Sequence, residues 1–481
     1  MPSVDRAFAR RHLRHRDAGH DLAALPDPAQ PPGTDCLPEI KHIVVLMMEN
    51  HSFDNYFGTL GHGEGLVCEP DGSPGPANQR LDGGVVRPFH LPSTVQLRGV
   101  PTQSWHASHL QFADGRNDGF VQSIEQTVPG GDSRVPMGYW TAEDLRFYSD
   151  LARTYALADR WHCSLLGPTF PNRRFLMAAT ADGLIDDVLA SVIDYPRTGT
   201  VFDLLDRHGI SWVNYHHVRP SRPVAKRVLG SAGLRAGRAV RLGAAGLFGR
   251  GLKTGLQDLQ FTADLYPLGM WRCLRHLRHV EQFFRDARDG TLPAFSIVDP
   301  DFNACSEENP QDVQIGEGFA AAVIQAVTAG KGWPNTVLVW LYDEHGGYFD
   351  HVSPPPAPEP DAVLPRSLFD SRGPLRWLLR QLGDWKKLSA IDSGAGRYDR
   401  LGFRVPAVVV SPFAKPGYVS HQVYDHTSVL KLVERKWNLP PLTARDAEAN
   451  DLLEMLDFEH APLLEPPELA APAVPWAVAG T

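Results

Sequence analysis

The sequence predicts an α/β fold in which helices cover a central, mostly parallel sheet. Apolar runs rich in β-branched residues alternate along the chain with stretches of helical period. Two of these runs end abruptly at acidic and amide groups, as strands do where an open sheet builds a site at their carboxyl ends. The predicted strands are His42–Met48, Ser211–Tyr215, Ala294–Val298, Val337–Leu341 and Pro406–Val410. The predicted helices are Thr141–Arg153, Arg275–Arg288, Gly316–Ala329 and Thr427–Trp437.

Two predicted strands carry oxygen ligands at their ends. The run IVVLMMEN stops at Glu49 and Asn50, and the run VLVWLYDEHGG continues into Asp343 and Glu344. Three carboxylates without a cysteine partner favour a hard or borderline divalent ion, and gathering them without a cation is costly. The alternative is that each caps a loop or pairs with an arginine, which is the commoner case for a lone glutamate. An acidic pair directly after a buried strand indicates chemistry instead.

Two glycines follow the second acidic pair. Gly346 and Gly347 allow the backbone to turn sharply and to approach a ligand closely. The two strand ends together predict one shared metal or phosphate centre, built from segments far apart in the chain.

Length and charge bound the organisation of the chain. It has 481 residues, a hydrophobic fraction of 43% and a net charge of −9, so no global basic field marks a nucleic-acid-binding protein. We expect a basic mobile arm over residues 1–37, a catalytic domain over residues 38–460 and a Pro/Ala-rich tail over residues 461–481. No run approaches the ~18 apolar residues of a transmembrane helix.

The N-terminus and the cysteines bear on the cellular compartment. Arg10 and Arg11 resemble part of a twin-arginine export signal, but no apolar segment follows, so this start does not encode a signal peptide. Five cysteines without a CxxC pair indicate mostly free thiols rather than the disulfides of a secreted protein. The expected location is the cytoplasm, or the cell envelope if the true start differs.

Two segments have the composition of inserted caps. Residues 217–257 hold nine Lys or Arg and no Asp or Glu, and residues 365–388 combine a leucine stripe with Arg, Lys and Trp. Such patterns suit a membrane interface or a cap over an anionic substrate. The alternative is a solvated basic loop and an ordinary surface helix.

The stretch SLLGPTFPNRRF places a hydroxyl near a helix start. Thr169 lies just before a helix that we expect to begin at Pro171, where N-terminal amides bind anions. The donors of residues 172–174 add groups that suit phosphate oxygens. The alternative is that Thr169 is an N-cap, and these residues alone do not decide between the two roles.

Histidines supply candidates for proton transfer. His426 precedes a stretch of helical period, and a histidine at a helix N-terminus tends to stay neutral and can transfer a proton or bind metal. A structural histidine is nonetheless the commoner case. His109 lies in QSWHASHLQF, a stretch whose spacing is too loose to define a metal site by itself.

Five motifs taken together resemble the bacterial phosphoesterase family that contains phospholipases C and the related acid phosphatases. They occur in the family's order between about Pro38 and Phe458. The resemblance implies an alkaline-phosphatase-like three-layer sandwich, with a central sheet between helical layers and added cap insertions. The motifs are IKHIVVLMMENHSFDNYFG, GPTFPNR, TVLVWLYDEHGGYFDHVSPP, RVPAVVVSPFAKPG and YDHTSVLKLVE.

The resemblance also implies roles for single residues. Thr169 resembles the family's nucleophile in its position within the motif. Asn50 and His426 match positions that contact the phosphoryl group or the leaving oxygen. The residues that look like metal ligands are Glu49, Thr169, Asp343 and Glu344.

Two departures from the family pattern concern proton delivery. Gln103 and Asn309 stand where many relatives have histidine, so His109 or His426 must supply the proton. We expect a metal-dependent phosphoesterase, similar to a phospholipase C, that works through a phosphothreonine. Its oxygen ligands fit one or more Ca²⁺, Mg²⁺, Mn²⁺ or Zn²⁺ ions.

The partners implied are a phosphate ester or phospholipid substrate and a peripheral membrane contact, with no nucleic acid. Two alternatives stay open at this point. One is an acid phosphatase acting on phosphomonoesters, and the other is a catalytically impaired relative that binds lipid or membranes.

Overall fold

An eight-stranded sheet forms the centre of the protein. The computed structural model describes residues 25–67, 74–187, 196, 198–217, 274–366 and 396–477. The strand order is β12-β6-β11-β10-β1-β9-β7-β8, and most neighbouring pairs are parallel. The strands are β1 His42–Met48, β6 Ala156–Ala158, β7 Trp212–His216, β8 Leu277–His279, β9 Phe295–Val298, β10 Thr336–Tyr342, β11 Ala407–Val410 and β12 Val419–Ser420.

The two longest strands lie side by side in the middle of the sheet. β1 and β10 are parallel and in register from His42 opposite Thr336 to Met48 opposite Tyr342, and β9 pairs with the other side of β1. Almost every residue of β1 and β10 is buried. Their continuous apolar sequences, rather than an alternating pattern, are what a parallel strand covered on both faces requires.

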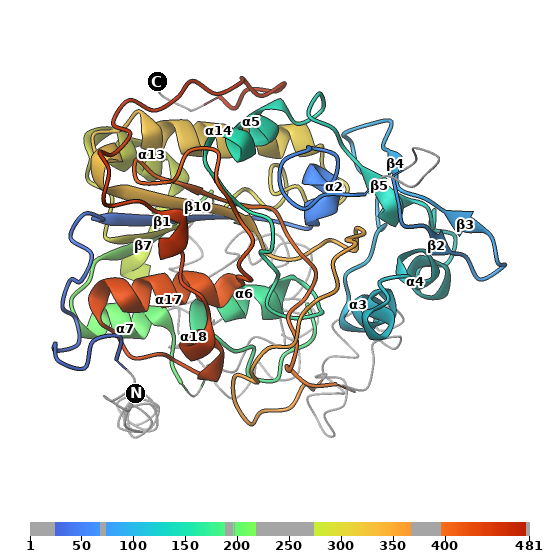
Figure 1. The fold of residues 1–481 in the computed structure, drawn as a ribbon, viewed down its shortest axis with the longest axis horizontal. Helices are drawn as coiled ribbons and strands as arrows, with labels where there is room; N and C mark the ends of the chain where they lie inside the picture. The colour runs from blue at the N-terminus through green and yellow to red at the C-terminus, as the bar shows by residue number, and fades with distance from the viewer. Residues whose placement is uncertain are drawn as a thin grey trace, which may run out of the picture.

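Helices cover both faces of the sheet, as Figure 1 shows. This arrangement confirms the predicted α/β fold with a central sheet between helical layers. On one side lie α5 Arg146–Thr154, α13 Val280–Asp289 and α14 Val313–Thr328. On the other lie α6 Thr169–Ala178, α7 Val201–Arg207, α17 His426–Trp437 and α18 Ala444–Glu448.

A smaller lobe extends beyond the end of β1, at the right of Figure 1. It holds α3 Trp105–Phe112, α4 Phe120–Thr127, β2 Asn78–Gln79, β3 Val85–Val86, β4 Phe89–His90 and β5 Gly138–Tyr139, while α2 Phe53–Phe57 packs in the main core after β1. Short 3₁₀ turns span Ala113–Gly115, Val135–Met137, Leu274–His276, Trp333–Asn335 and Leu453–Met455. The lobe therefore stands at the edge of the sheet where the parallel strands deliver their carboxyl ends.

Some predicted elements differ from those observed. The helix predicted from Arg275 begins only at Val280, because Leu277–His279 instead form the edge strand β8 on β7. The helix predicted from Thr141 begins at Arg146, after a turn in which Leu145 N–H donates to the Thr141 carbonyl. Strand β11 runs antiparallel to β10. For β8 and β11 a tertiary strand pairing decides what local periodicity leaves open, whereas the start of α5 is set by a local turn.

The end of the predicted N-terminal arm is anchored rather than free. Gly33 N–H donates to the carbonyl of Trp437 at 2.9 Å, and Cys36 N–H donates to that of Lys436 at 2.7 Å. Residues 1–24 lie outside the described residues, as do almost all of the predicted insertions at 217–257 and 365–388.

The described cysteines agree with the free thiols expected from composition. Cys36, Cys163 and Cys305 are free thiols, while Cys68 and Cys273 lie outside the described residues. No helix within the described ranges is long and apolar enough to cross a membrane.

Candidate active site

The carboxyl ends of three neighbouring parallel strands meet at one edge of the sheet. Glu49 follows β1, Asp343 follows β10 and Asp299 follows β9. All three side chains are buried. The predicted convergence of the two acidic chain segments is therefore a consequence of strand order.

A single buried arginine, Arg173 of α6, joins these three carboxylates. Its Nε lies 2.7 Å from Asp343 Oδ2, its Nη2 lies 3.6 Å from Glu49 Oε1, and its Nη1 lies 3.9 Å from Asp299 Oδ1. Nη2 also donates to the carbonyl of Met48 at 3.1 Å. Burial lowers the pKa of Arg173, but the carboxylates outweigh this effect and raise it overall.

One guanidinium does not balance the negative charge around it. Burial raises the pKa of Glu49 well above its ordinary value, and Glu308 and Asp343 add to the rise. Burial does the same to Glu344, with Asp343 adding to it. The pKa of Asp299 rises to about 7, mainly through burial. Repulsion from Asp343 contributes to the raised pKa of both Glu49 and Glu344, and a bound cation would relieve it.

Several oxygens of the cluster are buried without a hydrogen-bond donor among the described residues. They are Glu49 Oε2, Asn50 Oδ1, Asp299 Oδ1 and Glu344 Oε1. Because an unsatisfied buried acceptor costs about 1–3 kcal/mol, such a group of oxygens in one place calls for a ligand that is not part of the chain.

The backbone after β1 is strained so that it can meet the loop after β10. Asn50 has a φ of 70°, and its N–H donates to Asp343 Oδ1 at 3.2 Å. A Cβ at Gly346 would collide with the Asn50 carbonyl oxygen, and one at Gly347 would collide with the backbone of Thr102. The glycine pair is thus required by close packing within the chain, whereas we had expected it to serve the approach of a ligand.

Thr169 is the first residue of α6, two residues earlier than the predicted start. Pro168 occupies the N-cap position, and no side chain caps the helix. Thr169 is partly exposed, and its hydroxyl makes no hydrogen bond with the described residues. The alternative role as an N-cap is therefore excluded. Thr169 and Arg173 are four residues apart, so they share one face of the helix.

The three donors that follow Thr169 are buried and make hydrogen bonds within the chain. Asn172 is buried, and its amide donates to the carbonyls of Gly167 and Pro168 at 2.9 and 3.1 Å. Arg173 binds carboxylates, as described above, and Arg174 donates to the carbonyl of Ala181 at 3.1 Å. Asn172 thereby holds the loop before Thr169, and a role of these three donors in binding phosphate oxygens stays a prediction.

The two candidate histidines occupy different environments. His426 is buried at the start of α17, with Nε2 2.6 Å from the Asp343 carbonyl oxygen, and Trp161 Nε1 donates to its Nδ1 at 3.4 Å. Nε2 therefore carries the proton in the tautomer that these bonds assign, and burial lowers the pKa of His426. His109 is half-buried on α3, and its Nδ1 lies 2.7 Å from the Trp105 carbonyl oxygen.

Two acidic residues at the rim were missed by sequence reasoning. Asp187 Oδ1 accepts from Phe170 N–H at 2.8 Å, directly beside Thr169. Glu308 lies two residues after Ser306, whose carbonyl oxygen accepts a hydrogen bond from Glu49 N–H at 3.0 Å. Both side chains reach solvent, yet desolvation by the surrounding protein raises the pKa of each to about 7, and Asp343 adds to both rises. Neither follows a predicted strand, so no local pattern marks them.

A separate acidic group lies nearby. Asp54, Asp350 and His351 are the only described residues that bring three ligand atoms of His, Cys, Asp or Glu within 4.8 Å of one another. Arg404 already binds Asp54 Oδ1 and Asp350 Oδ1, each at 2.9 Å, and His351 Nδ1 lies 2.6 Å from Asp54 Oδ2. A guanidinium thus fills the place of a metal ion there, and this group is structural.

A buried glutamate supports the segment that carries Glu308. Glu307 Oε2 accepts from the hydroxyls of Tyr56 and Tyr342, each at 2.5 Å, and Oε1 accepts from Tyr148 at 2.6 Å. Its carbonyl accepts from Gln96 Nε2 at 2.5 Å. Burial nevertheless raises the pKa of Glu307 to about 8.

Comparison with known proteins identifies the family. The sequence profile of the Phosphoesterase family matches residues 40–440, which is most of the chain. The chain belongs to the Phosphoesterase family. It is thereby a phosphoric ester hydrolase, as the sequence predicts.

Curated relatives of this phosphoesterase come from bacteria and a plant. Phospholipase C A of Mycobacterium tuberculosis is 29% identical over 471 residues, which cover 91% of this chain and 81% of the relative. Hemolytic phospholipase C of Pseudomonas aeruginosa is 29% identical, over 89% of this chain and 57% of the relative. Non-specific phospholipase C1 of Arabidopsis thaliana is 27% identical, over 89% and 73%.

Among solved structures, a protein of the alkaline phosphatase superfamily from Vibrio parahaemolyticus aligns with this phosphoesterase. The alignment has a TM-score of 0.34 at 11% identity and covers 90% of this chain and 76% of the other. That score is too low to support the fold assignment, which depends on the sheet and helical layers themselves.

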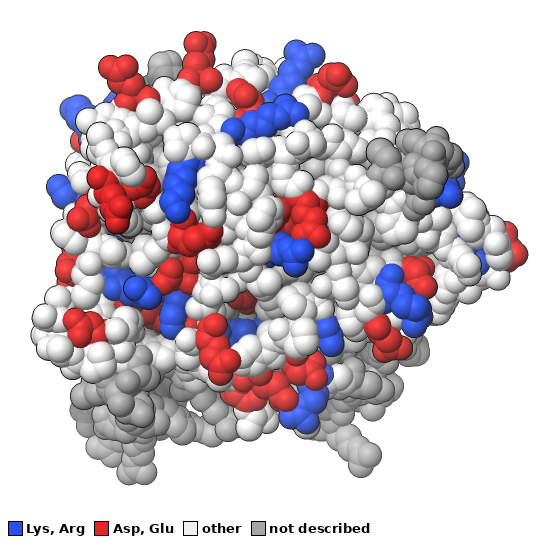
Figure 2. All heavy atoms as spheres, in the orientation of Figure 1, with Lys and Arg blue, Asp and Glu red and all other residues white. Residues whose placement is uncertain are grey.

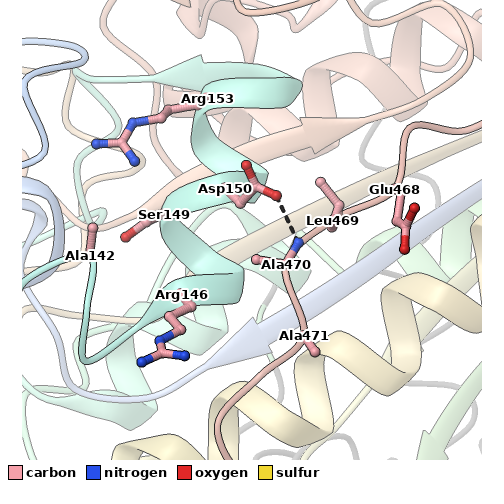
Figure 3. A pocket seen from close by; sticks show the side chains of 9 residues that line it. All are labelled: Ala142, Arg146, Ser149, Asp150, Arg153, Glu468, Leu469, Ala470 and Ala471. Atoms are coloured by element: carbon pink, nitrogen blue, oxygen red, sulfur yellow. Dashed lines mark hydrogen bonds between the residues drawn. The ribbon is translucent and has the colours of Figure 1, made fainter.

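The phosphoesterase also has a hollow on a different side of the molecule. Figure 3 shows it between α5 and the C-terminal segment, where Ala470 N–H donates to Asp150 at 2.7 Å. Its volume is about 620 Å³, and Arg146, Arg153 and Glu468 contribute the other charged groups of its lining. None of the predicted site residues lines it, so it is not part of the strand-end site.

Replacing Arg173 tests the ion cluster. We expect Arg173→Met to lower the free energy of unfolding by about 3–5 kcal/mol, because Asp343 and Glu49 are left buried without their counter-charge. Arg134→Met is the matched control, since Arg134 is 63% exposed and its ion pair with a described residue is to the half-buried Asp132, so we expect no measurable change in stability. Urea denaturation in the presence of a chelator measures both, and equal effects would contradict the assignment.

Replacing Glu307 tests its buried acid form. The unfolded side chain loses its proton near its ordinary pKa, and the folded one only near pH 8, so wild-type stability falls as pH rises between these values. Glu307→Gln cannot titrate, so the loss of stability with rising pH should be smaller, by at most about 1.4 kcal/mol per pH unit.

Glu454 provides a control of opposite sign. It also accepts from Ser420, Tyr418 and Tyr424, but these bonds outweigh desolvation and lower its pKa. Its stabilising effect is therefore lost as pH falls, so Glu454→Gln should flatten the acid side of the curve instead. Thermal unfolding from pH 4 to 9 compares the two variants, and the same pH response in both would show that the Glu307 assignment is wrong.

Proposed function

We propose that this protein is a metal-dependent phosphoesterase, similar to a phospholipase C, that hydrolyses phosphate esters through a phosphothreonine on Thr169. The observation that carries the proposal is the placement of an uncapped, partly exposed hydroxyl at the start of α6. The same helix face holds Arg173, which binds the carboxylates after β1 and β10. The names of the curated relatives support phospholipids as the substrate class.

The reaction has two displacements at phosphorus. Thr169 Oγ1 attacks in line and forms a bond to phosphorus, while the bond to the ester oxygen breaks and that oxygen takes up a proton. Water then attacks the phosphothreonine, and the Thr169 hydroxyl is the second leaving group. Donors near the negative oxygens lower the barrier, and the N-terminus of α6 is the element best placed to provide amides.

The residues that would hold the metal are Glu49, Thr169, Asp343 and Glu344. Their oxygens are the donors that hard divalent ions prefer, and Glu49 and Glu344 each keep one buried oxygen without a donor. The ligand atoms of these three carboxylates are more widely spaced than those of the Asp54 group, and Arg173 contacts two of the carboxylates. The chemistry that a bound cation supplies is polarisation of a phosphoryl oxygen and a lower pKa for the Thr169 hydroxyl.

Proton delivery to the leaving group favours His109 over His426. Both ring nitrogens of His426 are engaged, with the Asp343 carbonyl and with Trp161, and burial keeps this ring neutral. His426 therefore positions the loop after β10. His109 is partly exposed, and its ring lies 4.4 Å from that of Trp105, whose side chain packs against Gly167 in the loop before Thr169. Asn309 donates to the Val100 carbonyl and has no proton to transfer.

Removing the Thr169 hydroxyl tests the nucleophile. We expect Thr169→Ala to lower kcat for a chromogenic phosphodiester by more than about 1000-fold while thermal unfolding is unchanged, because the hydroxyl makes no structural bond. Thr169→Ser keeps a hydroxyl and should retain measurable turnover. Thr127→Ala is a matched control, since that hydroxyl bonds only to the Ser123 carbonyl of its own helix. Retained turnover in Thr169→Ala would rule out the nucleophile.

Removing divalent ions tests the metal. We expect a chelator to abolish turnover, and re-added ions to restore it and to raise the melting temperature of the wild type. Glu49→Gln with Glu344→Gln should lose the rise in melting temperature, because these side chains supply the ligands. His351→Gln is the control and should keep the rise, since its acidic group is already neutralised by Arg404. A loss of the rise in His351→Gln alone would place the metal at the Asp54 group instead.

A further inference from the structure

Exposed apolar side chains are concentrated on the lobe beside the site. The described residues expose eight large hydrophobic side chains, and five of them fall between residues 67 and 97. Single exposed hydrophobics scattered over a surface need no explanation, but a local concentration marks an interaction site. We call these five the lobe surface: Val67, Leu81, Val85, Val95 and Leu97, each more than half exposed.

The hairpin of β2 and β3 holds two of these side chains outward on a fixed backbone. Val85 is 63% exposed, while its neighbour Val86 is buried in a cluster with Phe120. Leu81 lies in the turn between the strands, and its N–H donates to Glu125 Oε2 at 2.8 Å. Strand alternation directs one side chain inward and the next outward, so the exposure of Val85 follows from the pairing and not from a loose chain.

A second segment of the lobe surface lies directly against the site rim. Val95 forms a β-bridge with Asp312, and Asn309 donates to the Leu97 carbonyl at 3.5 Å. Gln96 points inward and binds the Glu307 carbonyl, whereas Val95 and Leu97 on either side of it point outward at 55% and 53% exposure. The segment that supports Glu308 therefore presents two apolar side chains to the outside.

Two arginines accompany these apolar side chains. Arg87 and Arg98 are exposed, and neither forms an ion pair with a described residue. Arg87 lies two residues after Val85, and Arg98 follows Leu97. The face shown in Figure 2 carries charges of both signs without a large field of one sign, and the net charge is −9, so any attraction to anions must be local.

We propose that the lobe surface docks on a phospholipid bilayer and brings the strand-end site to the lipid–water boundary. Apolar side chains next to exposed arginines suit this boundary, because the former enter the edge of the acyl region while the latter bind lipid phosphates. The docking gives the site access to lipid substrates, so this inference is built on the proposed phospholipase C-like function.

Vesicle sedimentation with the full chain tests the docking. We expect the wild type to bind phosphatidylcholine vesicles and to bind more tightly when phosphatidylglycerol is included. Leu81→Asp with Val85→Asp should lower the partition coefficient about tenfold or more, since two apolar side chains are lost from the interface. Leu464→Asp with Val474→Asp is the control, because these exposed residues lie on the C-terminal segment, and it should bind as the wild type does.

Two further measurements separate the contribution of the arginines to vesicle binding from any effect on catalysis. Arg87→Gln with Arg98→Gln should remove the preference for anionic vesicles and flatten its salt dependence. Hydrolysis of a water-soluble phosphodiester should be unchanged in every variant. If the wild type does not bind vesicles, or both aspartate pairs lose binding equally, the docking proposal is overturned. It is also overturned if the Leu81/Val85 variant turns a wild-type dimer into a monomer. If the wild type binds vesicles but does not hydrolyse the soluble phosphodiester, only the proposed function is overturned.

Discussion

The buried guanidinium of Arg173 is the interaction on which the candidate site depends. A charged group at 2% exposure is tolerated only when counter-charges and acceptors surround it, and here these come from the ends of β1, β9 and β10. Helix α6 therefore cannot slide or rotate relative to the sheet without breaking these contacts. Thr169, one turn earlier on the same helix, inherits its position from this constraint.

Charge balance distinguishes the two acidic groups near the strand ends. Around Arg404, two carboxylates face one guanidinium and His351, whose pKa is raised by Asp54 although burial opposes the rise. Around Arg173, three strand-end carboxylates share one guanidinium, and Glu344 lies close enough for Asp343 to help raise its pKa. Proximity of ligand atoms alone favours the first group, but the excess of negative charge and the oxygens without donors favour the second as the place for a cation.

The sequence was a good guide wherever the signal is local. Continuous apolar runs predicted β1, β9 and β10 to within one residue, because strands covered on both faces have no polar alternation. The acidic residues after β1 and β10 could be assigned to one edge of the sheet, because parallel strands have their carboxyl ends at the same edge. The direction of β11, the pairing of Arg173 and the rim position of Asp187 could not be predicted, because each is set by contacts across more than a dozen residues.

The segment from Ser306 to Asp312 connects the chemistry of the site with the outer surface of the lobe. Its first residue binds Glu49 N–H, and its last forms a bridge with Val95. Between them Glu307 is fixed by three tyrosine hydroxyls, and Gly316 of α14 makes room for its side chain, since a Cβ there would collide with it. These contacts join the Val95 segment of the lobe to the segment whose first residue binds the backbone of Glu49. The backbone that carries Val95 and the backbone that carries Glu49 are therefore held by one continuous segment.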